Sequence, residues 1–479
     1  MSVVPPHETD SSHDLATTST IIEDNGCGTN YFPLMDLPQE LLIEIFHCAC
    51  LAHGGKANAV NPLFLSKICR SWRAVIFETR AFWQEVNLIL NSHCSTQISL
   101  LEEWTARAGD LPLSISIVYP KSMLETLLPE EELTHLLDLI RILSPQTHSL
   151  SLETPVEFYD RWRDCGLADY SWPLLSNLVL STTLGSSSLS DASHKLDFLS
   201  CPILTTTTIK SLLHSHVCLP WRSLLHIRSS FDSVFCSEIY TALELCPLLR
   251  TLEAHGIVEN DNFSAKTIDH HSLKGLTFEL DEEEDDCQEC CRLLNSLRLP
   301  ELRTLVIKIG QSPPLKSFEL DIYPCISQSC CQLSELTIEG AFLEPTVFIN
   351  SLRLLPSLRS LRISYNSWGT PQTTYTASGE PAPLSLIMTA GPDALLMLPN
   401  LREVTFDPSS VGYSAEVVVG LLASRWDNLG DNVGALATLQ SVTIRPEHEY
   451  MNESPWVVSK YQEVVFENWR QRGYSFKVE

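Results

Sequence analysis

The chain has 479 residues, of which 44% are hydrophobic and 19% are charged, a composition typical of a folded protein with more than one domain. Its 59 acidic and 32 basic residues give a formal net charge of −27, and a field of this sign repels phosphate backbones and anionic lipids. Nucleic acid and membrane are therefore not expected as partners.

The amino-terminal segment predicts neither export nor an ordered domain. Residues 1–30 are rich in Ser, Thr, Pro and acidic residues, which is typical of a disordered tail. They lack the basic and apolar stretches of a signal peptide, and no run of about 18 apolar residues follows that would span a membrane. We expect a protein of the cytoplasm, the nucleus or both, in which the 16 cysteines remain reduced thiols.

The first ordered region, predicted over residues 31–90, opens with an amphipathic helix. Residues 34–46 contain the stretch LPQELLIEIF, whose apolar side chains recur at helical spacing. Pro38 suits the first turn of a helix, where its missing N–H costs nothing, and Glu40 favours the positive end of the helix dipole. By itself the stretch fits a helix on its own core as well as it fits a surface for another protein.

A second helical pattern follows in the same region. Residues 47–61 are expected to form a loop, and residues 63–77 a helix whose apolar side chains recur at steps of three and four. Phe82 and Trp83 come shortly after it. A helical module of this size is marginal for a core of its own, so docking onto another surface would stabilise it.

The remainder of the chain predicts strands that alternate with helices. In the connecting region, 91–145, we expect a helix near 98–108 and a first strand at 112–117, where PLSISI alternates in polarity. From residue 146 to residue 479 a short pattern recurs: Leu, two residues, an aliphatic residue, one residue and a residue that is usually apolar. Its copies start at Leu175, Leu204, Leu224, Leu249, Leu273, Leu302, Leu333, Leu358, Leu401 and Leu439.

Two features indicate that this pattern is a structural repeat. Most intervals between copies fall near about 20–29 residues, the period of leucine-rich repeats. Proline stands two residues before many of the starts, where it ends a helix and enters a strand without needing a donor. These prolines are Pro173, Pro202, Pro247, Pro300, Pro356 and Pro399. The predicted fold class is α/β: a small all-α module, then a curved leucine-rich-repeat solenoid with parallel strands on one face and helices on the other.

The segments between the strands agree with a solenoid. Helical stripes are expected at Val234, Phe235, Ile239 and Leu243, and at Cys287, Cys290, Cys291, Leu294 and Leu297. The turn-rich segment at 368–383 is typical of an exposed insertion. Residues 467–479 predict a last helix, a glycine stop and a strand that cap the array.

The sequence carries no motif that demands catalysis. It lacks a nucleophile elbow, a phosphate-binding loop and a zinc-protease motif. The cysteines of CQECC (287–291) lack a second ligand pair at zinc spacing, so we interpret them as part of a buried helix stripe. The acidic run DEEEDD (281–286) fits a solvated loop, or a docking patch for a basic segment. We expect no enzyme activity, no cofactor and no metal.

The two helical patterns of residues 31–90 together resemble an F-box. The matching residues are Leu37, Pro38, Glu40, Leu41, Leu42, Ile45 and Phe46, then Leu65, Cys69, Arg70, Trp72, Arg73, Phe82 and Trp83. The chain departs from the family pattern at Ile68, where Val is usual, at residues 78–80, which lack a proline, and in its longer loop at 47–61. With the repeats behind it, the layout resembles fungal F-box proteins that carry degenerate leucine-rich repeats.

This resemblance implies a substrate-recognition subunit of an SCF-type (Skp–cullin–F-box) ubiquitin ligase. The helical module would bind the Skp-type adaptor, and through it the cullin–RING ligase, while the repeats hold a substrate protein that the sequence does not identify. The residues implied in adaptor binding are Leu37, Pro38, Glu40, Leu41, Ile45, Phe46, Leu65, Ile68, Cys69, Trp72, Phe82 and Trp83. The alternative is a protein-interaction scaffold outside any ligase.

The apolar residues of LPQELLIEIF are expected to divide between contact with the partner and packing in the module's own core. Leu37, Pro38 and Leu41 are predicted to face mainly outward, toward the adaptor. Leu42, Ile45 and Phe46 are expected to be shared between the adaptor and the module's own core, in proportions that the sequence leaves open.

Overall fold

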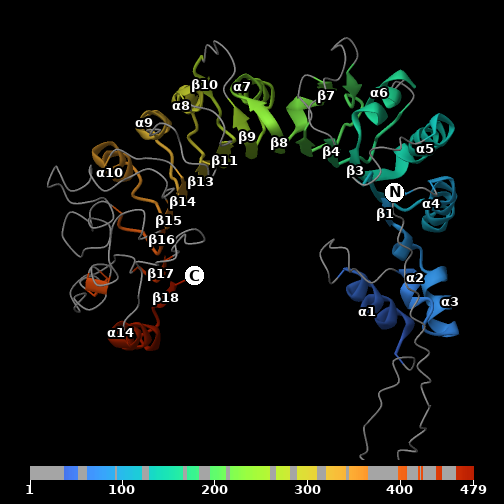
Figure 1. The fold of residues 1–479 in the computed structure, drawn as a ribbon, viewed down its shortest axis with the longest axis horizontal. Helices are drawn as coiled ribbons and strands as arrows, with labels where there is room; N and C mark the ends of the chain where they lie inside the picture. The colour runs from blue at the N-terminus through green and yellow to red at the C-terminus, as the bar shows by residue number, and fades with distance from the viewer. Residues whose placement is uncertain are drawn as a thin grey trace, which may run out of the picture. The chain divides into compact units, whose positions relative to one another are not determined.

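The computed structural model divides the chain into two compact units, residues 1–79 and 80–479, and each is described by itself (Figure 1). The described residues are 37–51, 62–91, 94–120, 129–165, 170–182, 195–211, 216–258, 266–280, 288–309, 320–340, 345–364, 398–406, 419–420, 422–423, 439–444 and 460–478. The predicted tail, the acidic run at 281–286 and the insertion at 368–383 lie outside these residues.

The described residues of the first unit form three helices: α1 (Gln39–Leu51), α2 (Pro62–Leu65) and α3 (Arg70–Glu78). Helix α1 begins later than predicted, directly after Pro38, and extends five residues into the expected loop at 47–61. The carbonyl of Pro38 accepts the first amide hydrogen bonds of the helix. The single helix expected over 63–77 is instead two helices, because the chain turns between Leu65 and Arg70.

The second unit is built on one large parallel sheet. Its fourteen strands follow the chain order, each paired with the next along the sheet. They are β1 (Glu85–Ile89), β2 (Leu113–Val118), β3 (Thr147–Thr154), β4 (Asn177–Thr182), β6 (Thr206–Lys210), β8 (His226–Phe235), β9 (Thr251–Val258), β11 (Gly275–Leu280), β13 (Thr304–Ile309), β14 (Glu335–Glu339), β15 (Ser360–Ser364), β16 (Glu403–Phe406), β17 (Ser441–Ile444) and β18 (Ser475–Val478).

Helices lie along one side of this sheet, as Figure 1 shows for α4 to α10. They are α4 (Cys94–Ala108), α5 (Glu130–Leu143), α6 (Val156–Asp164), α7 (Cys236–Leu245), α8 (Gln288–Asn295), α9 (Tyr323–Ser329), α10 (Pro345–Arg353) and α14 (Lys460–Gln471). Two short parallel pairs, β5 (Leu196–Asp197) with β7 (Val217–Cys218) and β10 (Ile268–Asp269) with β12 (Leu297–Arg298), accompany them. The chain is α/β, as predicted, and strands alternating with helices are consistent with a repeat solenoid.

The repeat pattern of the sequence coincides with the strands. Each of the ten predicted starts lies two residues before a strand, from Leu175 before β4 to Leu439 before β17. In register across the sheet, Leu276, Leu305 and Leu336 form part of a continuous apolar row, fully buried on the helix side. Burying one such side chain stabilises the fold by about 1.5–3 kcal/mol, so the stacked rows are the core.

The recurrent prolines occupy a turn that leads into each strand. At Pro247, for example, the amide of Leu249 donates to the carbonyl of Cys246, so that proline stands second in a four-residue turn. This position favours proline because its φ is already fixed near the required value. The same bond recurs at the other five predicted prolines. The predicted role of proline is thereby refined: it makes the turn that starts the strand.

The sheet begins earlier than predicted. Strand β1 lies inside the predicted helical region 31–90. Strand β3 lies at the start of the predicted repeat region, before the first predicted copy of the repeat at Leu175. Val234 and Phe235, predicted in a helix stripe, belong to β8, and α7 starts only at Cys236. The cap at the carboxyl end follows the prediction: α14 is followed by Gly473, at φ +90°, and by β18.

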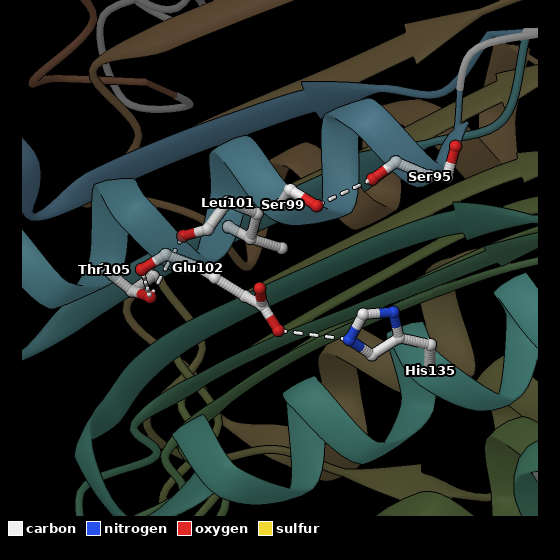
Figure 2. A network of polar contacts seen from close by, with 6 residues as sticks. All are labelled: Ser95, Ser99, Leu101, Glu102, Thr105 and His135. Carbon is white, nitrogen blue, oxygen red and sulfur yellow. Dashed lines mark hydrogen bonds and ion pairs between the residues drawn. The ribbon is translucent and has the colours of Figure 1, made fainter.

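Neighbouring helices of the array are also joined by polar contacts at their surface. His135 of α5 lies 3.0 Å from the Glu102 carboxylate of α4 (Figure 2). Within α4, the hydroxyls of Ser99 and Thr105 donate to backbone carbonyls one turn earlier. Such bonds satisfy the hydroxyls locally, so the helix contributes mainly apolar side chains to the core. In the described part of the chain, no helix is long and apolar enough to cross a membrane.

Candidate protein-interaction site

Helix α1 carries two neighbouring apolar stripes, about 100° apart around the helix axis, of which one is buried and the other exposed. Leu42 and Phe46, one turn apart, are buried at 3% and 1% exposure. Leu41 and Ile45, also one turn apart, are exposed at 52% and 41%. Side chains four residues apart share a face of a helix, so the helix anchors itself with one pair and presents the other to solvent. Ile45, predicted to be shared with the core, therefore lies on the outer stripe.

The buried stripe of α1 packs on α3. The ring centroids of Phe46 and Trp72 lie 4.5 Å apart at an interplanar angle of 51°. Trp72 is half-buried, and Ile76, one turn later on α3, is fully buried. Together with buried Leu65 of α2, these side chains form the small core of the first unit. Phe46 and Leu65, both predicted to contact the adaptor, thus serve this core.

The turn between α2 and α3 is held by side-chain hydrogen bonds. The Ser66 hydroxyl donates to the Leu63 carbonyl, and Arg73 Nε donates to the Ser66 carbonyl at 3.1 Å. Cys69 caps α3, because its exposed sulfur accepts the Trp72 amide at 3.4 Å. Capping residues satisfy amides that a helix cannot satisfy itself. Cys69 was predicted as an adaptor contact, and the structure gives it this structural task as well.

Helix α2 and the turn after it leave further apolar side chains in solvent. Phe64 and Ile68 are exposed at 62% and 53%, and Leu63 is exposed as well. Ile68 was among the predicted contacts, whereas Leu63 and Phe64 were not. The short stretch PLFL gives no periodicity from which an outward face could be predicted. Exposed large apolar side chains in this density are typical of protein-interaction surfaces.

The other predicted residues of LPQELLIEIF lie at the start of the helix. Pro38 and Glu40 are exposed, and Leu37 is half-buried. The exposed residues Pro38, Leu41 and Ile45 recur at steps of three and four, so they continue one face of α1. We call the set Pro38, Leu41, Ile45, Leu63, Phe64 and Ile68 the apolar surface of the first unit.

Phe82 and Trp83 lie elsewhere than predicted. They form part of a 3-10 helix, η2 (Arg80–Trp83), which belongs to the second unit. Both are buried, and Trp83 meets Trp104 of α4 edge-on at 4.8 Å while the Arg107 guanidinium lies over its ring. The predicted module boundary at residue 90 thus differs from the observed division after Thr79. These two aromatics stabilise the beginning of the sheet.

The solvent face of the sheet carries charged side chains that pair with one another. His255 lies 2.5 Å from Glu279 and 3.8 Å from Glu253, and Glu253 also pairs with Arg228 at 3.5 Å. Two strands further, Glu339 pairs with Lys308 at 3.6 Å and with Arg362 at 2.6 Å. Partly exposed pairs of this kind contribute little stability.

The cysteines of the described residues are free thiols, and many are buried. Cys290 of α8 is fully buried beside Leu294, in the stripe predicted for that helix, whereas Cys287 is not described. Burial raises the pKa of the Cys325 thiol to about 12 and that of Cys331 to about 11. Among the described residues, no group of three or more His, Cys, Asp or Glu side chains is arranged to hold a metal ion.

Comparison with known proteins adds little to this geometry. No protein-family model matches the chain, and no curated protein matches it. Among solved structures, the chain is similar to a protein from Bacteroides fragilis, with a TM-score of 0.27 and 14% identity over 58% of this chain. The match spans 66% of the other chain. Similarity at this level carries no argument about function.

Proposed function

We propose that the chain is the substrate-recognition subunit of an SCF-type ubiquitin ligase. In this proposal the first unit is an F-box that binds a Skp-type adaptor, and the second unit is a leucine-rich-repeat domain that binds a substrate protein. The chain itself makes no covalent bond. It raises the effective concentration of substrate lysines near the ubiquitin-loaded enzyme.

One observation carries the proposal: Leu41 and Ile45 are exposed on the helix whose sequence matches the F-box pattern, while Leu42 and Phe46 of the same helix are buried. A helix that served its own core alone would expose polar residues on its outer face. An apolar outer face on a small unit instead favours a permanent partner. The F-box pattern says which partner to test first.

The test is binding of the full chain to a purified Skp-type adaptor, measured by calorimetry. The double variant Leu41→Ala, Ile45→Ala removes the outer stripe and spares the core of the first unit. We expect it to bind the adaptor about ten- to a hundredfold more weakly, because two apolar contacts are lost. The matched control is Leu245→Ala, Leu248→Ala in the second unit, whose side chains are exposed at 41% and 53%.

The control variant should bind the adaptor like the wild type. If the wild-type chain does not bind a Skp-type adaptor, or if both double variants bind equally well, the F-box proposal fails. Capture of the adaptor without any cullin, together with unchanged ubiquitination of every co-purified protein, would instead favour the scaffold alternative. Purification with the Leu41→Ala, Ile45→Ala variant retains undegraded substrates and so identifies them.

A further inference from the structure

A row of basic side chains follows the amino-terminal edge of the sheet. In each repeat, the residue directly before the strand is the second of the repeat pattern. From β9 to β16 this position holds two arginines, a lysine, a serine and two more arginines. In sheet order they are Arg250, Lys274, Arg303, Ser334, Arg359 and Arg402. We call the five basic members the basic row.

The backbone fixes these residues side by side. The carbonyl of Arg250 accepts hydrogen bonds from the amides of Lys274 and Gly275. An equivalent pair of hydrogen bonds links every later pair of neighbours along the row. Adjacent members therefore stand about 4.8 Å apart, the spacing of neighbouring strands. Ser334 leaves one gap, between Arg303 and Arg359. The row thus holds three charges, a gap and two charges.

The side chains of the basic row form no ion pair within the part of the chain that the structure describes. All five side chains are exposed. Within the described residues, no ion pair joins any of them to a carboxylate, although the basic residues Arg228, Lys308 and Arg362 of the sheet face are all paired. Glu335, the nearest acid to the gap in sequence, approaches the Thr304 hydroxyl at 3.4 Å. These five cations thus lack an ion pair among the described residues, although the chain has 59 acidic and only 32 basic residues.

The repeat scaffold does not require basic side chains at this position. Ser176, Thr205 and Leu225 occupy it in the preceding repeats and Gln440 in a following one. The carbonyls of Ser176 and Thr205 each accept hydrogen bonds from two amides of the next repeat, as the carbonyls of the basic row do. The backbone pattern is the same where the side chain is neutral, so the pattern does not depend on a charge at this position.

We propose that the basic row binds an extended acidic peptide segment of a partner protein, lying across the strands at the amino-terminal edge of the sheet. The five steps from Arg250 to Arg402 span about 24 Å, at about 4.8 Å a step. An extended chain covers about 3.3 Å per residue, so about eight peptide residues match the row. Glutamates or aspartates toward each end of the peptide pair with the arginines, because a guanidinium group can form two parallel hydrogen bonds with one carboxylate.

The charge of the rest of the molecule favours a peptide over a nucleic acid. A formal net charge of −27 repels a long polyanion, whereas a short acidic segment experiences mainly the local positive field of the row. This proposal does not depend on adaptor binding by the first unit. In combination with the proposed function, the acidic segment would be the feature by which a substrate is recognised.

The experiment measures binding of the full chain to a fluorescent octaglutamate peptide, by anisotropy at low ionic strength. Octaglutamine is the uncharged control peptide. The variant Arg303→Gln, Arg359→Gln, Arg402→Gln removes three charges from the row. The matched control, Arg141→Gln, Arg298→Gln, Arg353→Gln, removes three exposed arginines elsewhere in the second unit and leaves the same net charge.

We expect octaglutamate to bind the wild-type chain and the control variant alike, and the row variant about ten- to a hundredfold more weakly. Added salt should weaken the binding, and octaglutamine should not bind. The proposal is overturned if octaglutamate does not bind the wild type, or if both triple variants lose affinity equally. It is also overturned if an eight-nucleotide single strand of thymidine binds the row more tightly than the peptide.

Discussion

The aromatic rings of Phe46 and Trp72 lie 4.5 Å apart and join α1 to α3. This contact belongs to the small core of the first unit, and it lies on the inner stripe of α1, whereas Leu41 and Ile45 on the outer stripe are exposed. It also makes a distinction possible between residues that stabilise the unit and residues that are available to a partner.

Replacing Trp72 with Ala should therefore loosen the first unit. The loss of the ring leaves a cavity beside Phe46, and we expect a cost of about 2–4 kcal/mol, reduced from the usual value because Trp72 is only half-buried. Hydrogen exchange of the α1 and α3 amides measures this locally, without relying on unfolding of the second unit.

The matched substitution is Leu41→Ala on the outer stripe. Because this side chain is exposed, its removal should change the exchange of the same amides by less than about 0.5 kcal/mol. Equal effects at Trp72 and Leu41 would contradict the division of α1 into an inner and an outer stripe.

The repeats show what could be predicted from the sequence and what could not. A strand two residues after each repeat leucine was predictable because the scaffold buries the same positions in every repeat. Phe82 and Trp83 were predicted as adaptor contacts of the helical module, but they lie in the second unit, because closeness in sequence does not say on which side of a boundary an aromatic packs. The break between α2 and α3 depends on the Ser66 and Cys69 hydrogen bonds, which helical periodicity does not reveal.

The candidate surfaces were less predictable than the scaffold. Leu41 and Ile45 could be predicted as candidate contacts because they belong to a helix whose sequence matches the F-box pattern. Members of the basic row are tens of residues apart in sequence, and the sheet alone places them side by side. Only the ion pairs in the structure distinguish them from the paired cations of the sheet face.

A second prediction concerns Tyr159 of α6, whose buried hydroxyl joins two strands. It lies 3.0 Å from the Leu152 carbonyl and 2.9 Å from the Ser181 carbonyl, and it accepts the Ser181 amide at 3.1 Å. Tyr159→Phe leaves these buried groups short of a partner, so we expect a loss of about 1–3 kcal/mol in chemical denaturation. Tyr323→Phe, at an exposed tyrosine, should cost less than about 0.5 kcal/mol.

A third prediction concerns Gly340, directly after β14. Its φ is +80°, and a Cβ there would lie 2.4 Å from the Ile309 carbonyl oxygen, closer than any real contact. Gly340→Ala should therefore cost more than about 2 kcal/mol, from backbone strain and the clash together. Gly473 also has a positive φ, +90°, but open space around it. Gly473→Ala isolates the strain and should cost about 1 kcal/mol; an equal loss at both sites would show that the clash is relieved.

The last prediction is that alkaline pH destabilises the second unit through its buried thiols. Burial raises the pKa of Cys201 and of Cys246 from 9.0 to about 12. Their stabilising contribution is complete below pH 9, where both states hold the proton, and is lost as the pH rises toward 12, because only the unfolded chain then releases it. Denaturation between pH 8 and about 11 should show this loss of stability, and Cys246→Ala should reduce the slope of stability against pH.

Thiol labelling tests the burial of the same cysteines. At pH 8 a thiol reagent should modify exposed Cys48, Cys69 and Cys330 well before Cys246. Equal labelling rates, or an unchanged slope in Cys246→Ala, would show that these thiols are not sealed in the core.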